Sequence, residues 1–177
     1  MKELSIFHIE DEFFEMRGWS KTVEAIVSDY FEELGEPRFT TTSLLKKNSS
    51  EDSFWEVYEI GWDAEAVIRY IFIRDPVIPA ELEAYITPRN IFVLDVLRPE
   101  AKGYKLKTSI QESIDSIRAI RTEREVDEIV LFTAYNGADL DLGAGVEYER
   151  IDKVKKDDLR LFFTKRIIAF LQSLASG

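Results

Sequence analysis

Cysteine is absent from the 177-residue chain, and histidine occurs once, as His8. The first absence excludes disulfides, thiolate nucleophiles and zinc–thiolate sites. A lone histidine argues against histidine-based catalytic triads and against metal sites built from several histidines. Chemistry in this chain must therefore come from carboxylates, hydroxyls, lysines or arginines.

Long apolar runs and positive charge are also scarce. No apolar stretch reaches the length of a transmembrane helix, and acids follow the first methionine too closely for a signal peptide. We therefore expect a cytoplasmic protein without a membrane contact. The net charge of −11 disfavours direct binding to nucleic-acid phosphates, whereas it suits a hard cation such as Mg²⁺ held by carboxylate oxygens.

The composition nevertheless provides a core. The chain is 45% apolar and 12% aromatic, and its length suits one domain with an embellishment. Apolar residues at three- and four-residue spacing predict helices over residues 13–34, 105–124 and 156–174. The last helix also carries Leu161 and Ile168 on the face opposite its main apolar stripe. This pair has two equal interpretations: partial exposure, or a contact with another chain such as a homodimer through the last helix.

The most informative stretch is the run of residues 90–94, which ends in the carboxylate of Asp95 and is followed by Pro99 and Gly103. A continuous apolar run bounded by polar and turn residues is typical of a parallel strand covered on both faces. In open α/β sheets, ligands bind at the carboxyl ends of such strands. Asp95 is therefore the first candidate for chemistry.

Three other predicted strands deliver polar residues in the same way. They are residues 4–9 followed by Glu10 and Asp11, residues 128–132 followed by Thr133, and residues 146–151 with Lys153 just beyond the strand. Within the first of these strands, we interpret His8 as a residue packed beneath a helix in preference to a ligand or proton shuttle.

Residues 37–88 have the least regular pattern. Residues 38–45 and 53–60 are strand-like and are separated by a polar turn, which favours a hairpin. The β-branched content of residues 66–73 favours a third strand over a helix. Residues 79–86 are predicted to form a short helix with proline in its first turn.

The residues at these strand ends can act together, because right-handed crossovers in a parallel sheet bring the strand ends to one edge. Glu10, Asp11 and Asp95 offer hard oxygen ligands for Mg²⁺. Asp95 is the candidate nucleophile for an acyl phosphate. Thr133 offers a hydrogen bond to the phosphoryl group, and Lys153 offers a cation that pairs first with Asp95 and then with a phosphoryl oxygen.

At this point the chain resembles the receiver domain of two-component response regulators. The resemblance covers roughly residues 3–34 and 90–174. It is carried by the acid pair in Ile9-Glu10-Asp11-Glu12, by Leu94-Asp95-Val96-Leu97-Arg98-Pro99 with Gly103 following, by Leu131-Phe132-Thr133-Ala134, and by Asp152-Lys153.

The resemblance implies a single receiver-like domain over residues 1–177, with an insertion at about 37–88. The implied fold is a flavodoxin-like, doubly wound α/β sheet of five parallel strands, with extra strands from the insertion. The implied activity is Mg²⁺-dependent transfer of phosphate onto Asp95 from a histidine kinase, a phosphotransfer protein or a small donor. Such a protein is not an enzyme beyond its own phosphorylation and dephosphorylation. It signals by contact with a downstream protein after a shape change near Thr133 and the last helix.

The chain departs from the family pattern at three places besides the insertion. Arg150 occupies the position at which the family usually has a switch aromatic residue, and Val154 occupies the position of the proline that often follows the lysine. Glu10 replaces a more common aspartate. One alternative is therefore a degenerate receiver that works only as a protein interaction module without phosphorylation. A Mg²⁺ phosphohydrolase is a weaker alternative, because Leu97 occupies the place of that class's second aspartate.

Overall fold

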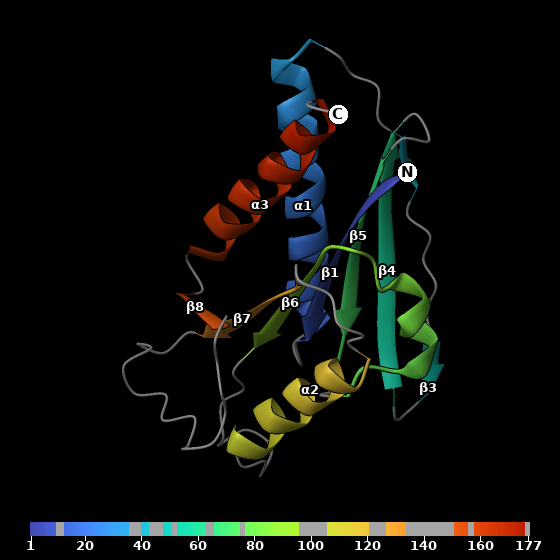
Figure 1. The fold of residues 1–177 in the computed structure, drawn as a ribbon, viewed down its shortest axis with the longest axis vertical. Coiled ribbons are helices and arrows are strands. Elements are labelled where there is room, and N and C mark those ends of the chain that lie inside the picture. The colour runs from blue at the N-terminus through green and yellow to red at the C-terminus, as the bar shows by residue number, and fades with distance from the viewer. Residues whose placement is uncertain are drawn as a thin grey trace.

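A mixed eight-stranded sheet with helices on both faces forms the molecule (Figure 1). This architecture confirms the predicted α/β class. The computed structural model describes residues 1–9, 13–35, 40–42, 48–50, 53–62, 66–74, 77–95, 106–120, 127–133, 151–155 and 158–175. The sheet order is β2-β4-β5-β1-β6-β7-β8, with β3 pairing to β4 away from this path.

The centre and one side of the sheet are built from parallel neighbours. Each of the pairs β5–β1, β1–β6, β6–β7 and β7–β8 is parallel. These strands are β1 (Lys2–Ile9), β5 (Ala66–Ile73), β6 (Asn90–Asp95), β7 (Asp127–Thr133) and β8 (Ile151–Lys155). The three central ones, β5, β1 and β6, have nearly continuous burial, as expected of parallel strands covered on both faces.

The other side of the sheet is antiparallel. β4 (Ser53–Trp62) pairs antiparallel with β5, and β2 (Thr40–Thr42) and β3 (Asn48–Ser50) both pair antiparallel with β4. The predicted pairing of the first two strand-like segments is confirmed as β2 with β4, and so is the strand over residues 66–73. The segment between β2 and β4 was predicted as a polar turn, but it contains β3. β5 lies within the segment predicted as an insertion, yet it pairs directly with β1. The strands added at the edge are therefore β2, β3 and β4.

One face of the sheet is covered by α1 (Phe13–Glu33) and α3 (Leu159–Ala175), which lie side by side in Figure 1. Val23 of α1 and Phe163 of α3 pack there with Ile6 of β1. The opposite face is covered by α2 (Leu106–Ile120) and by η1 (Ala80–Tyr85), a 3-10 helix. All three predicted helices and the predicted short helix after Pro79 are confirmed. None of the helices in the described ranges is long and apolar enough to cross a membrane.

α1 ends where the sequence predicts a stop. Gly35 adopts φ 68°, a left-handed conformation that glycine tolerates without a steric penalty. Its backbone N–H donates to the Glu32 carbonyl at 3.0 Å, and the Leu34 N–H donates to the Tyr30 carbonyl at 3.3 Å. These bonds use carbonyls that would otherwise lack a partner at the helix end.

Candidate functional site

The carboxyl ends of the parallel strands meet along one edge of the sheet. Register places Ile9 of β1 beside Leu94 of β6, Asp95 beside Phe132 of β7, and Thr133 beside Lys155 of β8. The last residues of four neighbouring strands thus lie within about one residue of a common level. The backbone therefore brings together the strand ends from which the predicted site residues come.

Asp95 is the last residue of β6, a strand flanked on both sides by parallel neighbours. The residues before it, Val93 and Leu94, are buried, so the strand is held firmly in the core up to its final residue. For Asp95 and Thr133 the structure describes the backbone position and not the side chain. Glu10 and Asp11 directly follow β1, and both lie outside the described residues.

The predicted position of Lys153 needs a correction. The sequence pattern placed Lys153 just beyond a strand over residues 146–151, whereas β8 spans Ile151–Lys155 and contains Lys153. Lys153 pairs in register with Leu131, two residues before Thr133, and Lys155 shares the row of Thr133. Asp152 and Lys153 are polar, so no apolar run at these positions predicts a strand. They are in a strand because β8 pairs with β7. The remainder of the predicted strand, residues 146–150, lies outside the described residues.

Two cations at this edge were missed by reasoning from the sequence. Lys155 is one, and Arg74 is the other. Arg74 is exposed and directly follows Ile73, which shares a row with Ile9. The sequence contains the same pattern here as at the other strands, because a charged residue, Arg74, directly follows the apolar run of β5. Arg74 was not selected as a site residue because residues 66–73 were expected to form one of the added edge strands.

The chemistry of the donor set fits Mg²⁺, since three carboxylates are the hard oxygen ligands that this ion prefers. In the sequence Glu10 and Asp11 follow β1 and Asp95 ends β6, and these two strands are direct neighbours. Within the described residues, no group of three or more histidine, aspartate or glutamate side chains could hold a metal ion. Glu10 and Asp11 lie outside these residues.

His8 is buried, as predicted, beneath α1. Its Nδ1 lies 2.6 Å from the hydroxyl of Tyr70 on β5, and its ring lies edge-on to Trp19 of α1 at 6.4 Å. Neither His8 nor Tyr70 is more than 1% exposed. The hydrogen bond to Tyr70 satisfies one ring nitrogen inside the core, which supports a packing role for this histidine.

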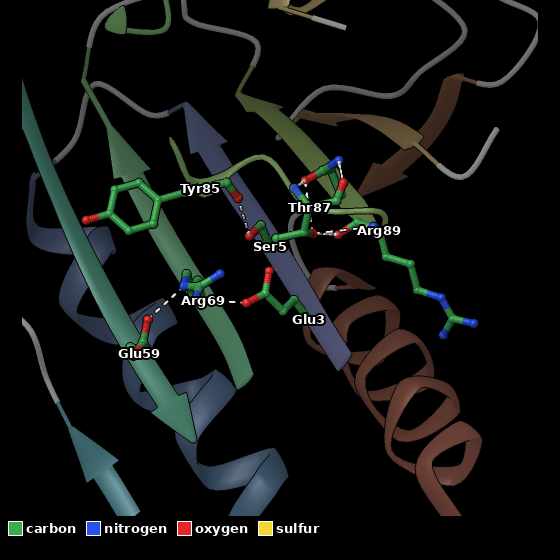
Figure 2. Close-up of polar contacts among 8 residues, drawn as sticks. Glu3, Ser5, Glu59, Arg69, Tyr85, Thr87 and Arg89 are labelled. Carbon is green, nitrogen blue, oxygen red and sulfur yellow. Dashed lines mark hydrogen bonds and ion pairs between the residues drawn. The ribbon is translucent and has the colours of Figure 1, made fainter. Parts of the chain in front are cut away.

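A group of polar contacts lies towards the opposite, amino end of the parallel strands (Figure 2). Arg69 of β5 donates through Nε to Glu59 of β4 at 2.7 Å and through Nη2 to Glu3 of β1 at 3.3 Å. Its guanidinium also lies 5.8 Å from the ring centroid of Tyr85. Burial acts to lower the pKa of Arg69, but the hydrogen bonds and negative charge of Glu59 and Glu3 outweigh it and raise the pKa.

A second group beside this triad fixes the chain where it enters β6. The Ser5 hydroxyl donates to the Tyr85 carbonyl at 2.7 Å. Asn90 accepts from the Thr87 N–H at 2.9 Å and donates to the Thr87 carbonyl at 2.7 Å. The Thr87 hydroxyl donates to the Arg89 carbonyl at 2.6 Å (Figure 2).

These groups at the amino end are matched with one another. One guanidinium faces two carboxylates, and the buried amide of Asn90 closes a ring with a backbone N–H and carbonyl. Polar groups that are already paired have little left to offer a ligand. The amino end is therefore a brace that ties β4, β5 and β1 together, and the carboxyl edge is the candidate site.

No protein-family model matches the chain, and no curated protein matches it in sequence. The candidate site therefore depends on the sequence motifs and on the strand register.

Proposed function

We propose that this chain is a receiver module that accepts a phosphoryl group on Asp95 and reports the event by contact with another protein. The observation that carries the proposal is the position of Asp95 next to the point where the strand order reverses. Numbered along the chain, the parallel strands β1, β5, β6, β7 and β8 lie in the order 2-1-3-4-5. That order is the flavodoxin-like one, in which ligands bind where the direction of winding changes.

In this chain the change of direction falls between β1 and β6, which are direct neighbours. β1 leads into Glu10 and Asp11, and β6 ends in Asp95. The three predicted Mg²⁺ ligands therefore come from the two strands that border the expected crevice. A chance arrangement of solvated acids would have no reason to favour this boundary.

The placement of the helices also supports a doubly wound sheet. α1 and α3 cover one face, and α2 with η1 covers the other. Connections that leave the central strand β1 in opposite directions produce this division. β2, β3 and β4 extend the sheet beyond β5 and so leave the proposed crevice between β1 and β6 uncovered by added strands.

In the proposed reaction, a carboxylate oxygen of Asp95 attacks the phosphorus of the donor. A new O–P bond forms to Asp95 while the bond from phosphorus to the donor's leaving group breaks. Glu10, Asp11 and Asp95 would hold Mg²⁺, which would neutralise charge on the phosphoryl oxygens. Lys153 provides a positive charge for the acyl phosphate, and Thr133 provides a hydroxyl donor. The acyl phosphate carries about two negative charges in place of the single charge of the Asp95 carboxylate, and this added charge can draw these two groups towards Asp95.

The proposed partners follow from the same chemistry. A histidine kinase or a phosphotransfer protein would supply the phosphoryl group, and a downstream protein would read the outcome. The proposed setting is the cytoplasm. The only turnover expected is self-phosphorylation and loss of the same phosphate.

Intact-mass analysis after incubation with acetyl phosphate and Mg²⁺ tests the proposal. We expect a single phosphoryl adduct on the wild-type chain, none on Asp95→Asn, and an unchanged adduct on Asp29→Asn, an exposed aspartate of α1. Omitting Mg²⁺ should remove the adduct.

Absence of the adduct from all three proteins would contradict phosphoryl transfer. If the wild type also fails to bind beryllofluoride with Mg²⁺, the chain is a degenerate receiver that works by protein contact alone. Steady turnover of a phosphate monoester would instead revive the phosphohydrolase alternative.

A further inference from the structure

The layer formed by α1 and α3 has exposed acids near the end of α1 and exposed bases near the start of α3, and the cations Lys2 and Arg89 bind Ser173 near the end of α3. The exposed acids are Asp29, Glu32 and Glu33. Leu34 follows them and is 56% exposed. We name these four residues the acidic patch. None of its carboxylates makes an ion pair with a described side chain.

Arg160 and Lys165 are exposed in the first half of α3, and Leu161 between them is 53% exposed. We name these three residues the basic patch. Neither cation makes an ion pair with a described side chain. α3 itself contains no acid, and in the sequence Asp157 and Asp158 directly precede it.

The charges of the acidic patch do not help its own helix. The carboxyl end of a helix carries partial negative charge, so acids there are unfavourable and cations are favoured. The last turn of α1 contains two glutamates and no basic residue. A nearby cation would relieve this unfavourable arrangement, and the basic patch supplies cations at the far end of the same layer.

The two patches lie at opposite ends of the layer because α1 ends near the amino side of the sheet whereas α3 begins near β8 (Figure 1). A two-fold axis in the plane of the layer, perpendicular to the line that joins the patches, sets each patch on the opposite patch of a second copy. Such an interface is isologous and closes after two chains. Leu161 of one copy then lies near Leu34 of the other.

We infer that two copies of this chain associate through the α1–α3 layer, with the acidic patch of each copy on the basic patch of the other. Of the two interpretations of Leu161 and Ile168, the inference favours a contact with another chain and gives that contact a defined partner surface. It does not rest on phosphorylation of Asp95. The occupant is a second copy because one surface carries both complementary charges together with an exposed leucine beside each.

The size of the layer sets the expected affinity. α1 has 21 residues and α3 has 17, so the layer is about 25 to 30 Å long and about 20 Å wide. Such a footprint buries about 1,000 Å² over both chains, the low end for a specific interface. We therefore expect a weak dimer with a Kd of about 1 to 100 μM, further weakened by salt.

Charge reversal followed by mixing tests the inference, with sedimentation equilibrium up to about 100 μM as the measurement. The base-reversed variant carries Arg160→Glu and Lys165→Glu, and the acid-reversed variant carries Asp29→Lys and Glu32→Lys. We expect each variant alone to dimerise at least about 10-fold more weakly than the wild type, because like charges then meet at both contacts. An equimolar mixture should regain the dimer, since both contacts of the mixed pair are attractive.

The control matched to the acid-reversed variant is Glu81→Lys with Glu83→Lys, which makes the same change in net charge at exposed positions of η1 on the other face of the sheet. This variant should dimerise as the wild type does. A wild-type chain that stays monomeric throughout, a mixture that stays monomeric, or a control that loses the dimer overturns the inference. All four proteins should keep the wild-type phosphoryl adduct, so failure here is distinguishable from failure at Asp95.

Discussion

The polar residues at the two edges of the parallel sheet differ in whether they are paired with other groups of the chain. At the amino edge, Arg69 is matched by Glu3 and Glu59, and Asn90 is matched by the backbone of Thr87. At the carboxyl edge, strands of buried apolar residues end abruptly in polar ones, as β6 does at Asp95. The first pattern uses polar groups to hold strands together. The second leaves them at the rim, where a ligand can complete their coordination.

The comparison shows why polar residues of the same type deserve different interpretations. Glu3 and Glu10 lie on the same strand or directly after it, seven residues apart. Glu3 shares a guanidinium with Glu59, so its charge is already balanced inside the chain. Glu10 follows the strand at the edge where ligands bind in such sheets. The edge to which a residue belongs, and not its type, indicates its role.

The largest expected effect comes from removing a cation at the carboxyl edge. We predict that Lys153→Ala lowers the rate of phosphoryl adduct formation about 100-fold, because it removes a charge that stabilises the transferring group. Lys153 starts two residues below the row of Thr133, about 6.6 Å, a distance that a four-carbon lysine stem can roughly span. Time-resolved intact-mass analysis with acetyl phosphate measures the rate.

Lys155→Ala serves as the matched variant and should change the rate less than about 3-fold. The reverse result, with Lys155 essential and Lys153 dispensable, would transfer the role to the lysine that shares the row of Thr133. Equal rates for both variants and the wild type would remove lysine from the proposed mechanism.

Breaking the brace at the amino edge should affect stability instead of chemistry. Arg69→Met leaves the two carboxylates, each 26% exposed, without their cation. We expect a loss of about 2 kcal/mol in the free energy of unfolding, below the figure for a fully buried pair because solvent screens part of the charge. Chemical denaturation measures the loss. Arg74→Met, an exposed arginine just past the other end of β5, should cost less than about 0.5 kcal/mol.

The contribution of Arg69 should not vary with pH near neutrality. Its folded-state pKa is raised, so its stabilisation is complete below the ordinary arginine pKa and is lost only as the pH rises through the raised value. The stability difference between wild type and Arg69→Met should therefore stay constant from about pH 6 to about pH 9. A difference that shrinks across this range would mean that another titrating group governs the brace.

The smallest expected effect lies between the edges, at the bond from Tyr70 to His8. Tyr70→Phe removes one buried hydrogen bond of 2.6 Å and should lower the free energy of unfolding by about 1 kcal/mol. The phosphoryl adduct should form at the wild-type rate. A slower rate would show that His8 belongs to the chemistry of the carboxyl edge after all.

Local patterns were sufficient to predict most of the fold. The apolar runs of β1 and β6, the spacing of Ile114 and Ile117 in α2, and the stop at Gly35 each depend on residues close together in the chain. A strand buried on both faces is a continuous apolar run, and a helix buried on one face has apolar residues at three- and four-residue spacing. Both patterns can be recognised in the sequence alone.

Pairing between distant segments could not be predicted in this way. Local patterns do not indicate that β5 pairs with β1 or that β8 extends to Lys155, because register is fixed by partners far along the chain. The ion pairs of the brace could not be predicted for the same reason, since Glu3, Glu59 and Arg69 come from three different strands. At the candidate site, the acids and Asp95 were selected from motif order, and Arg74 was missed because its strand was expected at the edge.

The far end of α3 is held to the rest of the molecule by two cations. Lys2 of β1 donates to the Ser173 carbonyl at 2.6 Å, and Arg89 donates to the Ser173 hydroxyl at 3.3 Å. A helix of 17 residues is a rod about 25 Å long, and its other end is held as well. Leu159 and Phe163 bury the start of α3 in the core, so a shift of β8 would reach Leu161 only by repacking these two side chains.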